Sequence, residues 1–94
     1  MRESTLETKL TKAAKNLDII TLKLQGSGDV GKPDRLFVYA GKCVFIELKG
    51  SKTVVKPKQI WWCNKLNKQG TPALISNNYE ECMEFLIKQL IERK

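Results

Sequence analysis

Residues 33 to 49 read PDRLFVYAGKCVFIELK, two apolar segments joined by a short turn. Aromatic and β-branched residues dominate both segments and a glycine separates them, which is typical of a β-hairpin. Charged side chains interrupt this pattern at its ends, with Asp34 at the start and Glu47 and Lys49 at the close. Unpaired charges are costly in a small core, so these three side chains need a common explanation.

The length of the turn decides which of these side chains lie together. A two-residue turn at 40–41 would put Asp34 opposite Glu47, whereas a turn at 41–42 would put it opposite Lys49, with Glu47 on the diagonal. Both registers bring the carboxylates together, with Cβ separations of roughly 5 to 8 Å. A bulged turn would separate them.

A metal ion explains the pair of carboxylates. Two partly buried carboxylates repel each other, and each is costly to remove from water unless a cation compensates. Mg²⁺ is commonly held by one or two carboxylates, waters and a substrate phosphate. The alternative is an Asp–Lys or Glu–Lys ion pair at an exposed strand end, and spacing alone does not choose between the two.

The rest of the chain predicts one α/β domain over residues 1–94, with the element order α-β-β-β-α-β-α. Ser4 and Glu7 resemble a capping box at the first helix, and Asn78 followed by Glu81 caps the last. Both faces of the hairpin are apolar, so we expect helices on both sides of the sheet. The expected elements are helices at about 4–17, 57–69 and after 78, strands at 19–24 and 73–76 beside the hairpin, and a loop at QGSGDVGKP, residues 25–33.

The charge balance favours an anionic partner. Lys and Arg number 17 against 10 acids, for a net charge of +7. Charge alone fits a solubilising surface as well as it fits nucleic-acid binding. The lysines between the second hairpin strand and the second helix favour DNA or RNA, since they concentrate on one stretch: Lys49, Lys52, Lys56, Lys58, Lys65 and Lys68.

The cysteine and histidine content excludes several chemistries. Three cysteines lie far apart, form no C-x-x-C pair and have no histidine to assist them, so we expect no zinc site and three small core residues in a reducing compartment. With no apolar leader or membrane-length apolar run, a cytoplasmic protein is expected. The absence of histidine also removes Ser-His and Cys-His nucleophiles, which leaves carboxylates, lysine and a metal for any hydrolysis.

The order GKPDR, strand, FIELK and then KPKQ opening a helix, with MRES at the start, resembles the VRR-NUC family of the PD-(D/E)XK nuclease superfamily, in its stand-alone phage or bacterial type. The resemblance covers nearly the whole chain. It implies a restriction endonuclease-like αβββαβ(α) core, with a mixed central sheet flanked by helices. It also implies an Mg²⁺- or Mn²⁺-dependent endodeoxyribonuclease.

The resemblance assigns roles to individual residues. Asp34 and Glu47 match the metal-binding carboxylates, Lys49 the catalytic lysine and Gln59 the helix glutamine of the family. The backbone carbonyl of Leu48 is a further expected metal ligand. One N-terminal acid completes the set, Glu3 from its place in MRES or Glu7, whose other explanation is the capping box. The residues expected to contact DNA are Lys32, Arg35, Lys52, Lys56 and Lys58, of which Lys32 stands where the family often has a small apolar residue.

Two features of the second helix can each be interpreted in more than one way. Helical spacing puts Gln59 on the inward face with Trp62, where it either serves the site or caps a backbone group. Trp61 and Trp62 are about 100° apart on a helix, so both cannot enter one core. We expect one to be partly exposed, where it stacks on a base, covers the rim or, as we prefer, packs at a subunit interface.

The function expected from these features is a metal-dependent DNA endonuclease, and the resemblance to the VRR-NUC family implies branched DNA as its substrate. The resemblance also points to a homodimer that resolves Holliday junctions, which agrees with the two-fold symmetry of a four-way junction, since one site cuts one strand. The alternatives are a non-catalytic basic nucleic-acid-binding module, or a flap-specific or restriction-like nuclease that works with a partner.

Overall fold

A computed structural model describes residues 1–24 and 30–93. Residues 25–29, the larger part of the expected loop at 25–33, lie outside the described residues. The order of elements is the expected one, with a π-helical turn, η1, continuing the last helix. The elements are α1 (Glu3–Asn16), β1 (Ile20–Lys23), β2 (Arg35–Tyr39), β3 (Lys42–Leu48), α2 (Pro57–Lys68), β4 (Ala73–Ser76), α3 (Tyr79–Leu86) and η1 (Ile87–Glu92).

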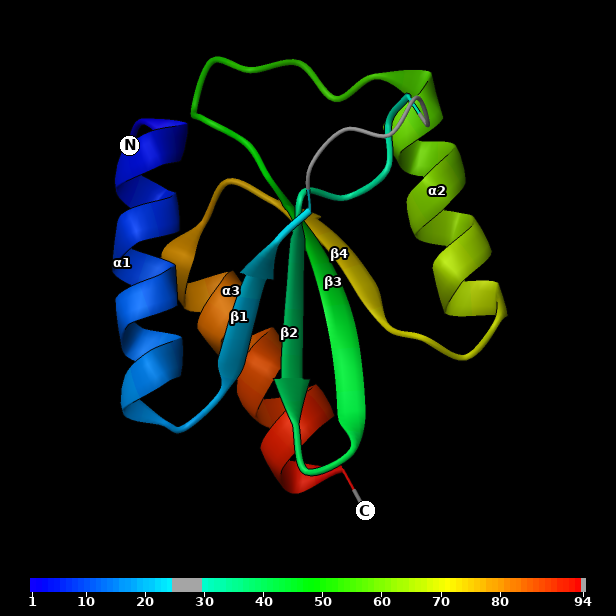
Figure 1. Ribbon diagram of the computed structural model, residues 1–94. Helices are drawn as coiled ribbons and strands as arrows, with labels where there is room; N and C mark the ends of the chain where they lie inside the picture. The colour runs from blue at the N-terminus through cyan, green and yellow to red at the C-terminus, as the bar shows by residue number, and fades with distance from the viewer. Residues whose placement is uncertain (25–29, 94) are drawn as a thin grey trace.

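The four strands form one mixed sheet in the order β1-β2-β3-β4 (Figure 1). Strands β1, β2 and β3 are antiparallel, and β4 joins β3 in parallel after the crossover through α2. Tyr39 pairs with Lys42, so the hairpin turn has the two residues Ala40 and Gly41, both with positive φ, at 50° and 78°. These dihedrals match the type I′ turn, whose twist suits a two-residue hairpin.

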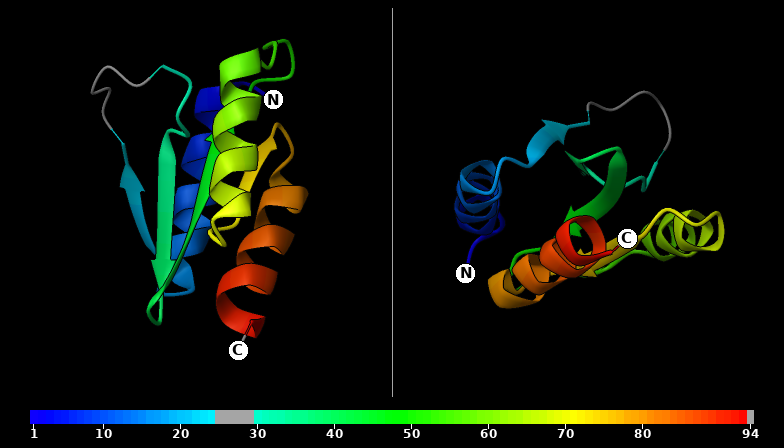
Figure 2. Two further views of the ribbon diagram at one scale, coloured as in Figure 1. Left: turned by 90° about the vertical axis from the view of Figure 1, so that its right-hand side faces the viewer. Right: turned by 90° about the horizontal axis from the view of Figure 1, so that it is seen from below.

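One face of the sheet carries the core. The helices α1, α3 and η1 lie on the same side of the sheet, and α2 lies beside β4 (Figure 2). Phe37, Val44, Ile46 and Leu48 point from β2 and β3 into this layer and are fully buried. The side chains that meet them come from α1, α3 and η1, chiefly Leu6, Leu10, Ala14, Cys82, Leu86 and Leu90.

The opposite face is covered less completely than the sequence suggested. Helix α2 has no buried residue and packs against β4, and no described helix covers this face at β1 and β2. Ile20 and Leu22 of β1 are consequently 57% and 48% exposed. Their cross-strand partners on the same face are Val38 and Leu36. The mixed, helix-flanked α/β sheet is confirmed, but its second face retains an open apolar half.

Two local predictions are wrong. The side chain of Ser4 does not cap α1, because the helix begins at Glu3 with Arg2 as the preceding residue and has no side-chain cap. Glu7 lies inside the helix and pairs with distant cations. Cys43 is exposed, so the three cysteines are not all core residues; only Cys82 is fully buried.

Three expected end signals are confirmed. Helix α2 begins at Pro57 and is followed by Gly70 at a φ of 89°, the left-handed conformation that favours glycine after a helix. The Asn78 side chain accepts a hydrogen bond from the Glu81 N–H at 2.8 Å, which caps α3. No helix within residues 1–24 and 30–93 is long and apolar enough to cross a membrane.

The Asn67 side chain closes the outer edge of β4. Its Oδ1 accepts from the Ala73 N–H at 3.0 Å, and its Nδ2 donates to the Ala73 carbonyl at 2.9 Å. The two bonds reproduce the pairing that a neighbouring strand would offer. They satisfy one residue of an edge that would otherwise have unpaired main-chain groups.

Replacing Asn67 with Ala should therefore lower the free energy of unfolding by about 1 to 3 kcal/mol, since the Ala73 N–H loses its partner and the Ala73 carbonyl keeps only the weak hydrogen bond from the Cys63 thiol at 3.3 Å. Urea denaturation measures the change. Asn64→Ala is the matched control, because this exposed residue of the same helix makes no side-chain hydrogen bond to the described residues. Equal effects of the two substitutions would show that the edge contact contributes nothing.

Candidate active site

The hairpin register brings the two predicted carboxylates together. Arg35 pairs with Ile46, so Asp34, one residue before β2, lies beside Glu47, one residue further along β3. This is the arrangement expected from a turn at residues 40–41. The main-chain N–H of Asp34 also lies close enough to the Glu47 carboxylate to lower its pKa, which agrees with this pairing.

Glu47 is held by two neighbouring side chains. Its Oε2 lies 3.6 Å from the Lys49 ammonium and accepts a hydrogen bond from Gln59 Nε2 at 3.2 Å. Glu47 is only 8% exposed and Lys49 only 7%. An exposed ion pair at a strand end, the simpler interpretation from the sequence, does not describe this buried arrangement.

Asp34 has an unsatisfied oxygen. Its Oδ1 is buried without a hydrogen-bond partner among the described residues. Since the Lys49 N–H bonds to the Ser76 carbonyl, alternation along β3 turns the N–H and C=O of Leu48 toward the side where Asp34 lies. The nearby Leu48 N–H lowers the pKa of Asp34 and so partly offsets the rise that burial causes. The Leu48 carbonyl stays a predicted ligand.

Burial and neighbouring negative charges raise the pKa of both acids. Burial is the largest cause for each. It raises the pKa of Glu47 from 4.5 to about 7, with a further rise from Asp34 and a partial offset by the Lys49 charge. The pKa of Asp34 is raised as well, with Glu3 and Glu7 adding to the effect of burial. The site therefore holds negative charge at a cost that a cation would relieve.

A close backbone contact places the loop before Asp34 against α2. Gly31 has a φ of 88°, and a Cβ there would lie 2.7 Å from Lys58 Cβ and 3.1 Å from the Gln59 N. Only glycine fits both the conformation and the space. Trp62 Nε1 also donates to the Val30 carbonyl at 3.1 Å, which fastens the same loop to the helix.

The Gln59 side chain makes both of the contacts that the sequence left open, one to a backbone group and one to the carboxylate pair. Its Oε1 accepts from the Lys56 N–H at 2.8 Å and so caps α2, while its Nε2 donates to Glu47. The two ends of one amide thus tie the start of a helix to the carboxylate pair. Trp62 is half-buried beside Gln59, as expected, and Trp61 is the partly exposed tryptophan at 49%.

The two N-terminal acids differ in their partners. Glu7 Oε2 lies 3.1 Å from Arg35 Nε and 3.7 Å from the Lys23 ammonium, so two cations hold it. Glu3, in the first turn of α1, makes no ion pair with a described residue, and its charge raises the pKa of both Asp34 and Glu47. Glu3 is therefore the freer of the two candidates.

The expected DNA-contacting residues fall into two groups. Lys52, Lys56 and Lys58 are exposed, with the Lys58 ammonium 5.1 Å from the Trp61 ring centre, and Lys32 is half-buried. Arg35 is different, because its guanidinium binds Glu7 and Thr21 and its side chain is 14% exposed. We assign Arg35 to the fold and not to DNA contact.

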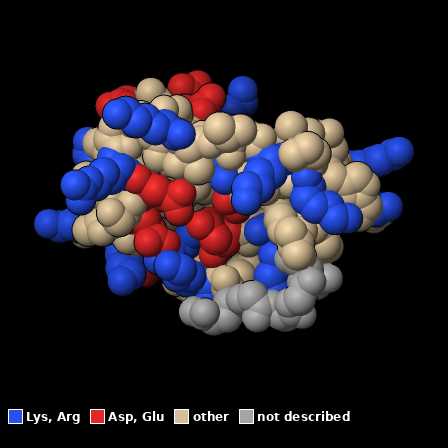
Figure 3. Space-filling model, turned by 90° about the horizontal axis from the view of Figure 1, so that it is seen from above, with Lys and Arg blue, Asp and Glu red and all other residues tan. Residues whose placement is uncertain are grey.

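The charges form a pattern on the face shown in Figure 3. Acidic side chains gather in the middle of this face, and Lys and Arg side chains surround them. Such a pattern suits an anion that carries or meets a cation at its centre, because the basic rim attracts the polyanion and the acidic centre requires neutralisation.

The residues present fit a hard divalent cation. The donors are carboxylate oxygens, one of them buried and unpaired, which suits Mg²⁺ or Mn²⁺. Within the described residues, however, no three His, Cys, Asp or Glu side chains lie close enough together to hold a metal by themselves. A metal here would rest on Asp34 and Glu47 and would need oxygens from main chain, water or substrate.

Two solved structures share this fold. One, described as a VRR_NUC domain, has a TM-score of 0.77 and 23% sequence identity over 92% of this chain and 94% of that chain. The other, described as a VRR_NUC domain protein, has a TM-score of 0.75 and 18% identity over 98% of this chain and 89% of that chain. No family model and no curated protein matches the sequence. The likeness confirms the expected fold, that of a VRR-NUC domain.

The raised pKa values predict an unusual pH dependence in metal-free protein. A carboxyl whose pKa rises from 4.5 to about 7 on folding binds more protons in the folded state between these values, so stability falls as pH rises from about 5 to 8. Thermal unfolding at several pH values measures this. Glu47→Gln should flatten the slope. Stability that rises over this interval would contradict a raised pKa of Glu47.

Proposed function

We propose that the chain is a metal-dependent nuclease that hydrolyses phosphodiester bonds in DNA at the Asp34–Glu47 pair. The observation that carries the proposal is the unpaired, buried Asp34 oxygen beside a Glu47 whose pKa is about 7. Lys49 lies next to this pair, and the fold is that of a VRR-NUC domain. Strongly shifted carboxylates with a specific charge partner are typical of functional sites.

Each side chain has a separate part in the proposed reaction. Asp34 and Glu47, with the Leu48 carbonyl, hold the metal, and the Gln59 amide fixes the orientation of Glu47. A divalent cation supplies neutralisation of the charge that develops on the scissile phosphate. Lys49 would present its ammonium to the same phosphate, where it stabilises negative charge or orients the water that attacks phosphorus and displaces a sugar oxygen. The exposed lysines around the site bind the flanking phosphates.

The central test is loss of cleavage without loss of binding. Asp34→Asn and Glu47→Gln keep the side-chain shapes but remove the metal-binding charge, so cleavage in Mg²⁺ or Mn²⁺ should fall at least about a hundredfold while DNA affinity stays within about threefold. Gel assays of linear, flap and junction DNA, with a chelator control, measure both. Cleavage at the wild-type rate by either variant would overturn the assignment, and no cleavage by wild type under any condition would favour the non-catalytic binding module.

Glu3→Gln and Glu7→Gln serve as a matched pair in the same assay. We propose Glu3 as the acid that assists the metal, so Glu3→Gln should lower cleavage and leave the melting temperature unchanged. Glu7→Gln should instead lower the melting temperature, because Arg35 and Lys23 lose their partner. The reverse result would assign the metal role to Glu7.

We further propose that the active form is a homodimer that acts on branched DNA, in particular on four-way junctions. Two chains are needed for paired cuts, and the open apolar half of the sheet supplies a surface. It carries Ile20, Leu22, Leu36 and Val38, with the exposed Cys43 opposite Val38. The last helix offers less apolar surface, because Leu86 and Leu90 are fully buried in the core.

Light scattering and mapping of both cut strands test the assembly. Ile20→Lys should convert a dimer to a monomer and abolish paired nicks in a junction. Ile91→Lys, a matched change at a partly exposed position of η1, should do neither. A wild-type monomer that cuts a flap as well as a junction would favour a general structure-specific nuclease that works alone or with a partner.

A further inference from the structure

A small cavity opens beside the proposed active site. It has a volume of about 200 Å³ and is lined by Lys49 from the end of β3 and by Ile75 and Asn77 from the end of β4 and the residue after it. Thr53 and Val55 of the connection to α2 close it. The carboxyl ends of neighbouring parallel strands are the usual ligand-binding edge of an open α/β sheet.

The lining divides into parts of different chemistry. Val55 and Ile75 provide an apolar wall, and Lys49 provides a cation that the cavity shares with the carboxylate pair. The Asn77 side chain is exposed and makes no hydrogen bond to the described part of the chain. Its amide is therefore available both to donate and to accept.

The cavity also contains an acceptor that is fixed in place. Glu81 lines it, and the buried Ser76 hydroxyl donates to Glu81 Oε1 at 2.5 Å. A carboxylate repels a phosphate but accepts a hydrogen bond from the exocyclic amino group of a base. The interior thus disfavours phosphate, whereas Lys49 at its side favours it.

We propose that this cavity is a subsite for one unpaired nucleobase of the nucleotide next to the scissile phosphate, with preference for a base that carries an exocyclic amino group. The base lies against Val55 and Ile75, its edge meets Asn77 and Glu81, and its phosphate lies toward Lys49. The volume is below the roughly 300 to 1,000 Å³ of sites for drug-sized ligands, which suits a single base. The proposal rests on the nuclease function, and it adds a reason for branched DNA to be preferred, because bases near a branch unpair at lower cost.

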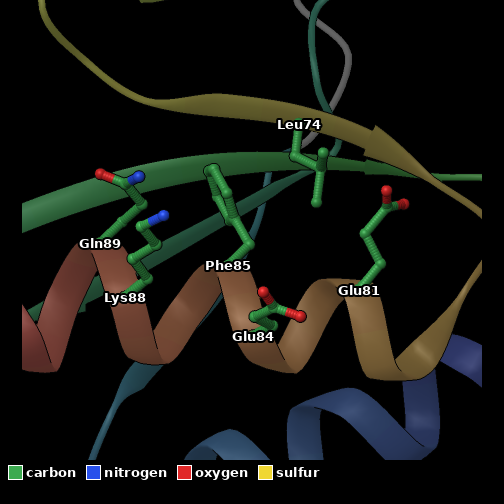
Figure 4. Close-up of a pocket in the computed structure, with 6 residues that line it drawn as sticks. All are labelled: Leu74, Glu81, Glu84, Phe85, Lys88 and Gln89. Carbon is green, nitrogen blue, oxygen red and sulfur yellow. The ribbon is translucent and has the colours of Figure 1, made fainter.

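A second hollow, between β4 and α3, does not fit the same ligand (Figure 4). It measures about 340 Å³ and is lined by Leu74 and Phe85 with the acidic Glu81 and Glu84. Two carboxylates and one lysine, Lys88, give it no net attraction for a polyanion, and Lys49 is not part of it.

Heteronuclear NMR titration of the intact chain with dCMP, dUMP and inorganic phosphate tests the subsite without any need for cleavage. The Asn77 side-chain amide and the Val55 methyl signals should shift with dCMP, shift less with dUMP, and stay in place with phosphate. Asn77→Ala should weaken dCMP binding about three- to tenfold, as for one lost hydrogen bond, and the matched control Asn64→Ala should leave it unchanged.

Three results would overturn the subsite: no shift with any nucleotide, equal shifts with phosphate alone, or equal binding of dCMP and dUMP. The result is separable from the proposed function. Binding of dCMP by a chain that never cuts DNA would refute the nuclease and leave the subsite, whereas cleavage without nucleotide binding would refute the subsite alone.

Discussion

The two-residue turn between β2 and β3 is the constraint on which the site depends. Side chains on a strand change faces at every residue, so one extra residue in this turn would put Asp34 and Glu47 on opposite faces of the sheet. The turn requires two residues in the left-handed region, and Gly41 adopts it without cost, but Ala40 does so at about 1 to 2 kcal/mol. The fold accepts this strain in exchange for a register that pairs the carboxylates.

The negative charges of the site repel one another, and the surrounding groups reduce this repulsion. Lys49 and Gln59 contact Glu47, and the Leu48 N–H lies near Asp34, yet the pKa of both acids remains raised. These contacts are enough to hold the two carboxylates in place but too few to neutralise their negative charge. The buried apolar layer on the other face of the same strands stabilises the fold and so offsets the cost of burying these two carboxylates. A cation-binding site requires a pair of carboxylates that is held in place but not fully neutralised, since the remaining negative charge attracts the ion.

Features set by local sequence could be predicted, and those set by distant contacts could not. The spacing of Pro57 and Gly70 and the Asn78 side chain fix their helix ends through neighbouring atoms, and all three were predictable. Glu7 was misread because its partners, Arg35 and Lys23, come from strands that only the tertiary fold places beside α1.

The difference between local and distant contacts also explains which parts of the site could be predicted. The carboxylate pair was predictable since hairpin registers are few, whereas the second hydrogen bond of Gln59 and the cavity beside Lys49 depend on how the β3–α2 connection folds back. One signal for the loop contact was present in the sequence: Gly31, two residues before the proline and aspartate, occupies a position where a backbone meets α2. The exposure of Cys43 follows from the half of the sheet that α2 does not reach, which composition cannot show.

The hydrogen bonds from Asn67 to Ala73 also restrict how copies of this chain can be arranged. A strand whose outward N–H and C=O are already occupied offers no template for another strand, so two sheets cannot merge into one across this part of β4. A single side chain therefore hinders the addition of a strand, and with it fibre-like growth, at Ala73. At this position of β4, association of copies must instead rely on side chains, whose shape and chemistry limit the number of copies.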